Sequence, residues 1–139
     1  MKGGLPKQFR KSEEATIKWL SMIQDRLGYE DTEAAFVAFR AVLHALRDRL
    51  TTEQGVDLVA QMPILIKGVF VDGWKPSKNP VKMRHKNEFL ERVQQELRDT
   101  MDPGETVKGV FDVIKVLISE GEIADIKSEL PEELQEFLQ

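Results

Sequence analysis

Apolar residues recur at steps of three and four along most of the chain. Between positions 31 and 50 they are Phe36, Phe39, Val42, Leu43, Leu46 and Leu50. Polar side chains such as Arg40, His44 and Arg47 fall between them, on the opposite side of a helical projection. This spacing is typical of an amphipathic α-helix that buries one face against the rest of the protein.

Local signals indicate where the helices begin and end. Gly28 can stop a first helix, because glycine readily takes the left-handed conformation that closes a helix. Thr51 and Gln54 have the spacing of a capping box at the start of a helix. Pro63 ends one helix and can open the next. The first half therefore predicts four helices, at about 10–27, 32–50, 52–61 and 63–71.

The same pattern returns after a shift of 68 residues. The matched pairs include Val42 and Val110, Leu46 and Ile114, Leu50 and Ile118, and Pro63 and Pro131. The capping box recurs as Ser119 and Glu122, and the first helix recurs around Phe89 and Val93 when its loop is shortened by two residues. The alternative is that amphipathic helices merely resemble one another, but a repeated cap and proline at one shift favour duplication.

The predicted fold is all-α, with two tandem four-helix units packed as one helical domain with a pseudo-two-fold internal duplication. Unit one covers about 9–72, a basic connector about 73–86, and unit two about 87–139. Asp48 and Arg49 of the first unit become Val116 and Leu117 in the second. We therefore expect 107–118 and 63–70 at the junction of the units, with 131–138 at an outer edge.

Composition restricts the class of protein. The 139 residues include no cysteine and carry a formal net charge of -4. Without cysteine there is no disulfide framework and no thiol nucleophile, so a cytoplasmic location is expected. The apolar runs are far shorter than the roughly 20 residues of a membrane span, so no membrane partner is expected. A globally basic nucleic-acid binder is disfavoured by the charge.

Several short motifs resemble those of one bacterial family. They are the run from Arg40 to Leu50, Gln61-Met62-Pro63, Gly73-Trp74-Lys75-Pro76, Ser119 to Ile123, and Glu129 to Leu134. The family is known as a domain of unknown function, number 2267, and the similarity extends from about Phe9 onward. Thr51 replaces a proline often found in that family, and Val69 replaces a tyrosine. The resemblance implies an all-helical bacterial protein and implies no activity.

The residues show no recognisable catalytic or metal-binding constellation. His85 lies 41 residues after His44, without the carboxylate spacing of a zinc motif, and His44 is expected to be solvated on a polar helix face. Acidic residues gather near the C-terminus at Glu120, Glu122, Asp125, Glu129, Glu132, Glu133 and Glu136. Helix capping and solubility explain most of them. We expect no cofactor, no metal and no enzyme activity.

The connector is the segment with the highest density of positive charge. Its candidate binding residues for an anion or a partner are Trp74, Lys75, Lys78, Lys82, Arg84, His85 and Lys86. Lysines could bind phosphate or an acidic surface, with the tryptophan available for stacking. The alternative is a solvated linker whose tryptophan closes the seam between the units.

A second possible surface comes from duplicated cations. Arg40 and Arg47 recur as Lys108 and Lys115, seven residues apart each time and so on one helical face. They also fit the ordinary polar face of an amphipathic helix.

Together these observations favour a non-enzymatic protein-interaction or self-association module, acting on a protein partner or as a homo-oligomer. The alternative is a nucleic-acid or anionic-ligand binder that uses the connector at 75–86, and an enzyme with an unfamiliar site is a third possibility.

Overall fold

The computed structural model describes residues 3–139, and within that range every regular element is a helix. The elements are α1 (Lys7–Leu27), α2 (Thr32–Arg49), α3 (Thr52–Val59), α4 (Ile64–Val71), the 3-10 turn η1 (Pro76–Lys78), α5 (Lys86–Gln94), α6 (Pro103–Leu117), α7 (Glu120–Glu129), α8 (Glu132–Gln135) and η2 (Glu136–Leu138). The all-helical prediction is confirmed, and the four helices expected in the first half end within a few residues of their predicted bounds. None of the helices in this range is long and apolar enough to span a membrane.

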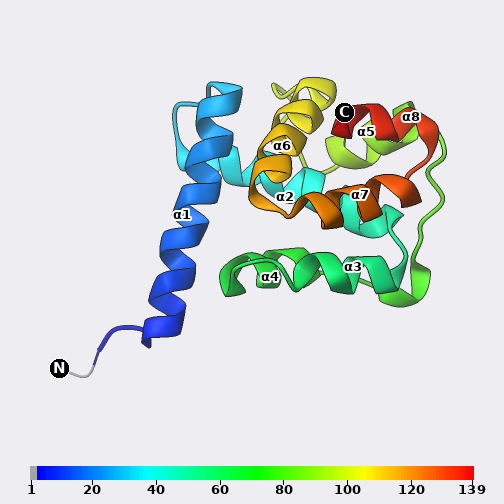
Figure 1. Cartoon of the computed structure of the whole chain (residues 1–139). Coiled ribbons are helices and arrows are strands. Elements are labelled where there is room, and N and C mark those ends of the chain that lie inside the picture. The colour runs from blue at the N-terminus through cyan, green and yellow to red at the C-terminus, as the bar shows by residue number, and fades with distance from the viewer. Residues whose placement is uncertain (1–2) are drawn as a thin grey trace.

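Helix α2 forms the centre of the protein (Figure 1). It contacts α1, α4, α5 and α6, and most of its length is buried. Four alanines make this close packing possible, because their small side chains let neighbouring helices approach the backbone. They are Ala35, Ala38, Ala41 and Ala45, all fully buried.

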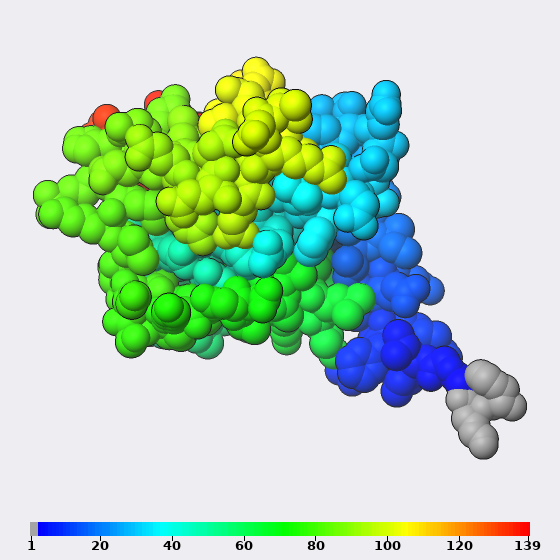
Figure 2. Space-filling view, turned by 180° about the vertical axis from the view of Figure 1, so that it is seen from behind, coloured from blue at the N-terminus to red at the C-terminus, as the bar shows by residue number. Residues whose placement is uncertain are grey.

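Helix α1 packs its C-terminal half on α2 and α6. Trp19 and Ile23 are buried there, and the Trp19 ring meets Phe39 edge-on at 6.0 Å between centroids. Gly28 closes the helix with a positive φ of 72°, as the sequence predicts. The first turns of α1 stand out from the body of the protein, as Figure 2 shows in blue.

The expected distribution of burial is only partly right. Helix α6 contacts α1, α2 and α5, so it lies between the two halves as expected. Helix α4 instead packs on α1 and α2 of its own half and buries only Ile66 and Phe70, so that expectation is wrong.

The C-terminal segment also departs from the expectation that it forms an outer edge. Its apolar residues Leu134, Phe137 and Leu138 are buried. The Phe137 ring lies 6.3 Å from that of Phe89 and 6.1 Å from that of Phe111. Contacts of α8 with α5 and of η2 with α6 therefore close this side of the core.

The two predicted capping boxes form only in part. The Thr51 hydroxyl accepts from the Gln54 amide, and the Ser119 hydroxyl accepts from the Glu122 amide. The reciprocal side-chain bond is missing from both, because Gln54 and Glu122 turn their side chains toward each other instead.

Candidate functional site: a cationic pocket at the connector

A pocket lies where α2, the segment after α4 and α5 meet, and we call it the connector pocket. Its lining residues are Arg47 and Asp48 of α2, Gly73, Lys75, Lys78, Asn79 and Val81 of the connector, Arg92 of α5, and Gln95 directly after α5. Its volume is about 480 Å³. Small-molecule sites commonly have volumes of about 300–1,000 Å³. The pocket is therefore large enough for a small ligand.

Positive charge dominates the lining of the connector pocket. Four cations, Arg47, Lys75, Lys78 and Arg92, face a single acid, Asp48. Lys75 and Lys78 are exposed, and neither forms an ion pair within residues 3–139. Unpaired ammonium groups beside two guanidinium groups make the pocket a candidate site for an anion.

Arg47 is the most deeply buried charge of the pocket, with only 3% of its surface exposed. Its Nη1 donates to the carbonyl oxygens of Phe70 at 2.8 Å and Asp72 at 2.9 Å. These carbonyls lie at the C-terminal end of α4, where helical carbonyls lack partners and the helix dipole favours a cation. The guanidinium therefore ties α2 to the end of α4.

The remaining nitrogens of Arg47 point to a free hydrogen-bonding site. Its Nε donates to Asp48 Oδ1 at 2.9 Å, while Nη2 takes no partner within residues 3–139. Every fully buried side-chain nitrogen or oxygen in this range has a partner. The unpaired Nη2 is therefore not completely buried, and Arg47 is one of the residues that line the connector pocket.

Arg92 is held in a similar way on the other side of the pocket. Its Nε donates to Asp48 Oδ2 at 3.1 Å, and its Nη1 donates to Glu96 Oε2 at 2.9 Å. Asp48 thus bridges the two arginines with its two carboxylate oxygens. Arg92 Nη2, like that of Arg47, has no partner in the described part of the chain.

The connector folds against the end of α2 through Asn79. The Asn79 amide nitrogen donates to the carbonyl oxygens of Arg47 at 2.6 Å and Leu50 at 2.8 Å. Close by, the Val81 amide donates to the Asp48 carbonyl at 2.7 Å. These bonds satisfy carbonyls at the C-terminus of α2 and fix the backbone that carries Lys75 and Lys78.

Trp74 is part of the protein interior rather than a free stacking surface. Its ring meets Phe70 edge-on at 5.5 Å between centroids, and its Nε1 donates to Asn79 Oδ1 at 3.0 Å. The ring also packs against Gly55 of α3, where an added β-carbon would approach the ring within 3.2 Å. Trp74 therefore packs on α3 and α4 of the first half, and these contacts do not place it between the two units.

His44 lies behind the pocket and corrects a prediction from the sequence. Expected to be solvated, it is 2% exposed. Its Nδ1 lies 3.0 Å from both carboxylate oxygens of Glu96, and its Nε2 lies 2.6 Å from the Val69 carbonyl oxygen. A carboxylate and a carbonyl only accept hydrogen bonds, so this geometry fits an imidazole ring that donates from both nitrogens.

Glu96 connects His44 to the pocket. Burial alone raises the pKa of this carboxyl, but the hydrogen bonds and positive charges of His44 and Arg92 outweigh that effect. The result is a pKa lowered to about 2. Arg40 adds a further ion pair at 3.3 Å. Glu96 therefore remains ionised at neutral pH and holds Arg92 in place.

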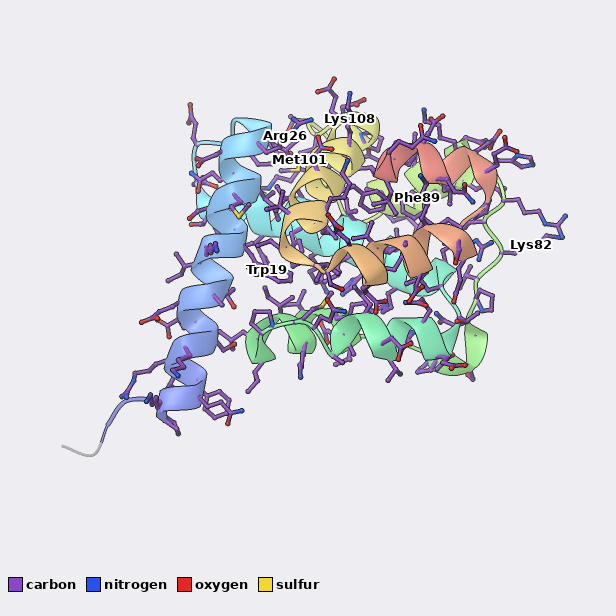
Figure 3. The ribbon with its side chains drawn as sticks, viewed as in Figure 1. Trp19, Arg26, Lys82, Phe89, Met101 and Lys108 are labelled. Carbon is purple, nitrogen blue, oxygen red and sulfur yellow. The ribbon has the colours of Figure 1, made fainter. Side chains whose placement is uncertain are left out.

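The other connector cations lie away from the pocket. Figure 3 places Lys82 at the outer edge of the molecule, and Arg84 is exposed. His85 Nδ1 lies 3.3 Å from Glu133 Oε2, and Lys86 Nζ pairs with Glu136 at 2.6 Å. The predicted basic segment is thus divided between the pocket, open solvent and the acidic C-terminal helices.

The four duplicated cations have different surroundings. Arg40 is partly exposed and pairs with Asp72 at 3.4 Å as well as with Glu96, while Arg47 is buried. Lys115 donates to the Gln139 carbonyl at 2.8 Å and pairs with Asp112, and Lys108 is exposed on α6 (Figure 3). Only Arg47 of this set contributes to the connector pocket.

The acidic C-terminal residues are similarly dispersed. Glu122 is buried, and burial together with the nearby carboxylates of Asp57 and Asp125 raises its pKa. Glu133 and Glu136 pair with connector cations instead. Between residues 3 and 139, no three His, Asp or Glu side chains converge in a way that could hold a metal ion.

Sequence reasoning missed three residues of the pocket as a group: Asp48, Arg92 and Gln95. They come from α2 and α5, which are separated by about 40 residues, so no short motif joins them. The one local signal is the pair Arg92 and Glu96, spaced four residues apart across the C-terminal end of α5.

The fold and pocket define an all-helical protein with a cationic cavity at the junction of its helices. Residues 16–137 match the model of a protein family described as an uncharacterized conserved protein, DUF2267. The chain therefore belongs to this family, as its resemblance to the family's motifs predicted. No protein of curated function matches the chain.

Proposed function

We propose that the protein is a non-enzymatic module that binds a small anionic ligand in the connector pocket. The observation that carries this proposal is the unequal charge of the lining, in which four cations face one acid. The two lysines are unpaired, and both arginines keep an unused Nη2. Such a site offers several charge-assisted hydrogen bonds to an anion.

The chemistry of the lining supports binding rather than catalysis. The pocket is lined by no serine, threonine, histidine or tyrosine, so a hydroxyl nucleophile and an imidazole base are both missing from it. Its only carboxylate, Asp48, is engaged by two guanidinium groups. The proposal therefore assigns recognition to this site and no reaction.

Calorimetric titration with a set of anions tests the proposal. Phosphate, sulfate and citrate are titrated into the protein at low ionic strength and again at high ionic strength. We expect binding that weakens as salt is added, because the interaction is ionic. The double variant Lys75→Gln/Lys78→Gln should weaken binding about tenfold or more, which corresponds to about 1.4 kcal/mol.

The matched control is Lys82→Gln/Arg84→Gln. It removes the same two charges from the same segment, but at exposed positions that do not line the pocket. The control should bind nearly as well as the unaltered protein. Equal losses in both variants, or no binding of any anion, would show that the pocket is not an anion site.

A second candidate function is self-association or protein binding through α1. The observation that favours it is a set of exposed apolar side chains on and before this helix, namely Leu5, Phe9 and Ile17, of which Ile17 is 56% exposed. Leu5 and Phe9 belong to the start of α1 and the residues before it, the region that stands out from the body in Figure 2, and Ile17 lies midway along α1. Exposed apolar side chains that gather on one element are typical of contact surfaces.

Light scattering after gel filtration tests this second candidate. A self-associating protein elutes at a mass above 15.9 kDa, and Phe9→Ser/Ile17→Ser should return it to the monomer mass. Val116→Ser is a suitable control, since Val116 is also highly exposed but lies on α6. A monomer at all concentrations would contradict self-association.

We also propose that the two halves arose by internal duplication, as the pattern of the sequence predicts. Contacts between the halves support this proposal because they occur in matched pairs. The Thr51 amide donates to Glu129, and the Ser119 amide donates to Gln61, each at 3.2 Å. Ser119 follows Thr51 by 68 residues and Glu129 follows Gln61 by the same number.

A second matched pair involves the first helix of each half. Arg26 of α1 pairs with Asp112 of α6 at 2.8 Å, and Glu96, two residues after α5, pairs with His44 of α2 at 3.0 Å. The shift of 68 relates His44 to Asp112, and the loop-corrected shift of 70 relates Arg26 to Glu96. The signs of charge are exchanged while the contact is kept, which supports a common plan for both halves.

A further inference from the structure

We propose that the ligand of the connector pocket is a phosphate monoester, with its dianionic phosphate held by Arg47, Arg92, Lys75 and Lys78. This inference rests on the proposed function, because it names the chemical class of the anion that the pocket binds. Three observations support it: the geometry of the Arg47 and Arg92 guanidinium groups, the net positive charge of the pocket, and the position of the remaining connector cations outside the pocket.

The two arginines are already oriented before any ligand enters. Arg47 is fixed by the Phe70 and Asp72 carbonyls, and Asp48 bridges Arg47 Nε to Arg92 Nε. Each guanidinium keeps its Nη2 unpaired within residues 3–139. Planar guanidinium donors match the oxygens of phosphate well, and fixing them in advance lowers the entropic cost of binding.

The charge of the site favours a dianion. Two acids, Asp48 in the lining and Glu96 behind it, bond to the arginines. Because Glu96 also pairs with Arg40 and His44, only Asp48 is counted against the four lining cations, which leaves an excess of three positive charges. A phosphate monoester carries about −1.5 to −2 at neutral pH, whereas a single carboxylate carries −1. The monoester therefore compensates more of this excess than a monoanion does.

The arrangement of the remaining cations argues against a nucleic-acid chain. A single-stranded nucleic acid needs a continuous basic groove with aromatic rings for stacking. Here Trp74 is packed against Phe70, and His85 and Lys86 are paired with Glu133 and Glu136. Outside the pocket, Lys82 and Arg84 are the connector cations that remain exposed without an ion pair among residues 3–139, and Trp74 offers no free ring for stacking beside them.

A phosphate monoester can come from two sources, a soluble metabolite or the headgroup of a phosphatidate-type lipid. Both present the same chemical group to the pocket. The test uses glycerol 3-phosphate as the probe for the first source. For the second source it uses phosphatidylcholine vesicles that contain about 20% phosphatidic acid. Binding of either probe through the pocket residues supports the proposal and identifies the source.

The experiment combines calorimetry, vesicle sedimentation and a pH series on the full chain. Glycerol 3-phosphate should bind at pH 7.5, and its affinity should fall several-fold at about pH 5.5, because the second phosphate pKa is about 6. Methyl sulfate, which has the same tetrahedral shape with a single charge at both pH values, should bind about tenfold more weakly at pH 7.5 and show little change with pH.

Variants connect the binding to the proposed residues. Arg92→Lys keeps the positive charge but removes the planar guanidinium group with its paired N–H donors. It should lower the affinity for glycerol 3-phosphate about tenfold. Arg92 is only partly buried, so this variant avoids the risk of misfolding that a change at the buried Arg47 carries. Lys75→Gln/Lys78→Gln should lose affinity as well, and Lys82→Gln/Arg84→Gln should retain it.

The outcomes separate this inference from the proposed function. If methyl sulfate or citrate binds as tightly as glycerol 3-phosphate and the pocket variants weaken both, the pocket binds anions but the phosphate monoester is the wrong class. If a single-stranded oligonucleotide binds more tightly than glycerol 3-phosphate, the monoester inference is also overturned. If no anion binds, both proposals fail.

Discussion

The Gln54 side-chain amide donates a hydrogen bond to the Glu122 carboxylate, across 68 residues of sequence. Each residue stands three positions after the capping residue of its own helix, Gln54 in α3 and Glu122 in α7. Two equivalent positions of the proposed duplication therefore meet where α3 packs on α7.

This contact explains why the predicted capping boxes are incomplete. In an isolated box, the side chain three residues into the helix would return to the capping residue's own amide. Here the Thr51 amide is satisfied by Glu129 and the Ser119 amide by Gln61. Each helix start thus uses acceptors from the other half, which links the halves through their caps.

Replacing Glu122 with glutamine should stabilise the protein at pH 7. Burial and the neighbouring acids raise the pKa of Glu122, so the stability associated with its protonated form is lost as pH rises through that pKa. Glutamine keeps an acceptor for Gln54 and removes the charge. We expect a gain of about 0.5–1 kcal/mol in the free energy of unfolding, measured by urea denaturation.

At low pH the gain in stability from this substitution should vanish. Below pH 4, roughly, the unaltered carboxyl is protonated in both states, so the advantage of Glu122→Gln should disappear. Glu120→Gln serves as the control, because Glu120 is exposed at the start of α7 and should give no gain. A Glu122→Gln protein that is less stable at pH 7 would contradict the prediction.

Glu96 should make the protein sensitive to acid. Its pKa is lowered to about 2, so the stability from its ionised form is present above the unfolded pKa of about 4.3 and is lost as pH falls toward about 2. Glu96→Gln should lower the free energy of unfolding at pH 7 by about 1–2 kcal/mol, allowing for solvent screening.

Denaturant titrations between pH 2 and pH 7 check this expectation. The curve of the Glu96→Gln variant should be flatter, and it should approach that of the unaltered protein at the acid end. Glu91→Gln, at an exposed position of α5 five residues before Glu96, should follow the unaltered curve throughout. Parallel curves for Glu96→Gln and the unaltered protein would exclude the assigned role.

Asn79→Ala should loosen the connector. The side chain makes hydrogen bonds with the Arg47 and Leu50 carbonyls and with Trp74, and its loss leaves these groups without partners. We expect destabilisation of about 2–3 kcal/mol and faster trypsin cleavage in the connector after Lys78 and Lys82. Asn87→Ala, at an exposed site, is the control, and equal cleavage rates in both variants would count against the prediction.

Gly109 should tolerate no side chain, unlike Gly121. A β-carbon at Gly109 would lie 2.8 Å from Leu27 Cγ, so α1 would have to move away from α6. Gly109→Ala should therefore cost about 1–2 kcal/mol despite the better helix propensity of alanine. Gly121 has open space around it, and Gly121→Ala in α7 should be neutral or stabilising by up to about 1 kcal/mol. Thermal unfolding of both variants tests the difference, and a Gly109→Ala protein as stable as Gly121→Ala would disprove it.

Much of the local structure could be predicted from the sequence. Helix spacing, the stop at Gly28 and the break at Pro63 depend on residues close in the chain, so a single sequence carries their signal. The burial of α6 followed from its apolar residues on several sides. The misplacement of α4 shows the limit, because a short apolar helix can pack on either half and its pattern does not say which.

By itself the sequence determined the helices, their approximate ends and the all-helical class, since these follow from interactions within a few residues. Only the tertiary structure decided the environment of the polar residues. His44 and Arg47 occupy polar positions of an amphipathic helix, yet the end of α4 and Glu96 after α5 cover them and accept their hydrogen bonds. The physical reason is that a charged side chain becomes buried when distant segments supply its partners, and no local pattern records which segments those are.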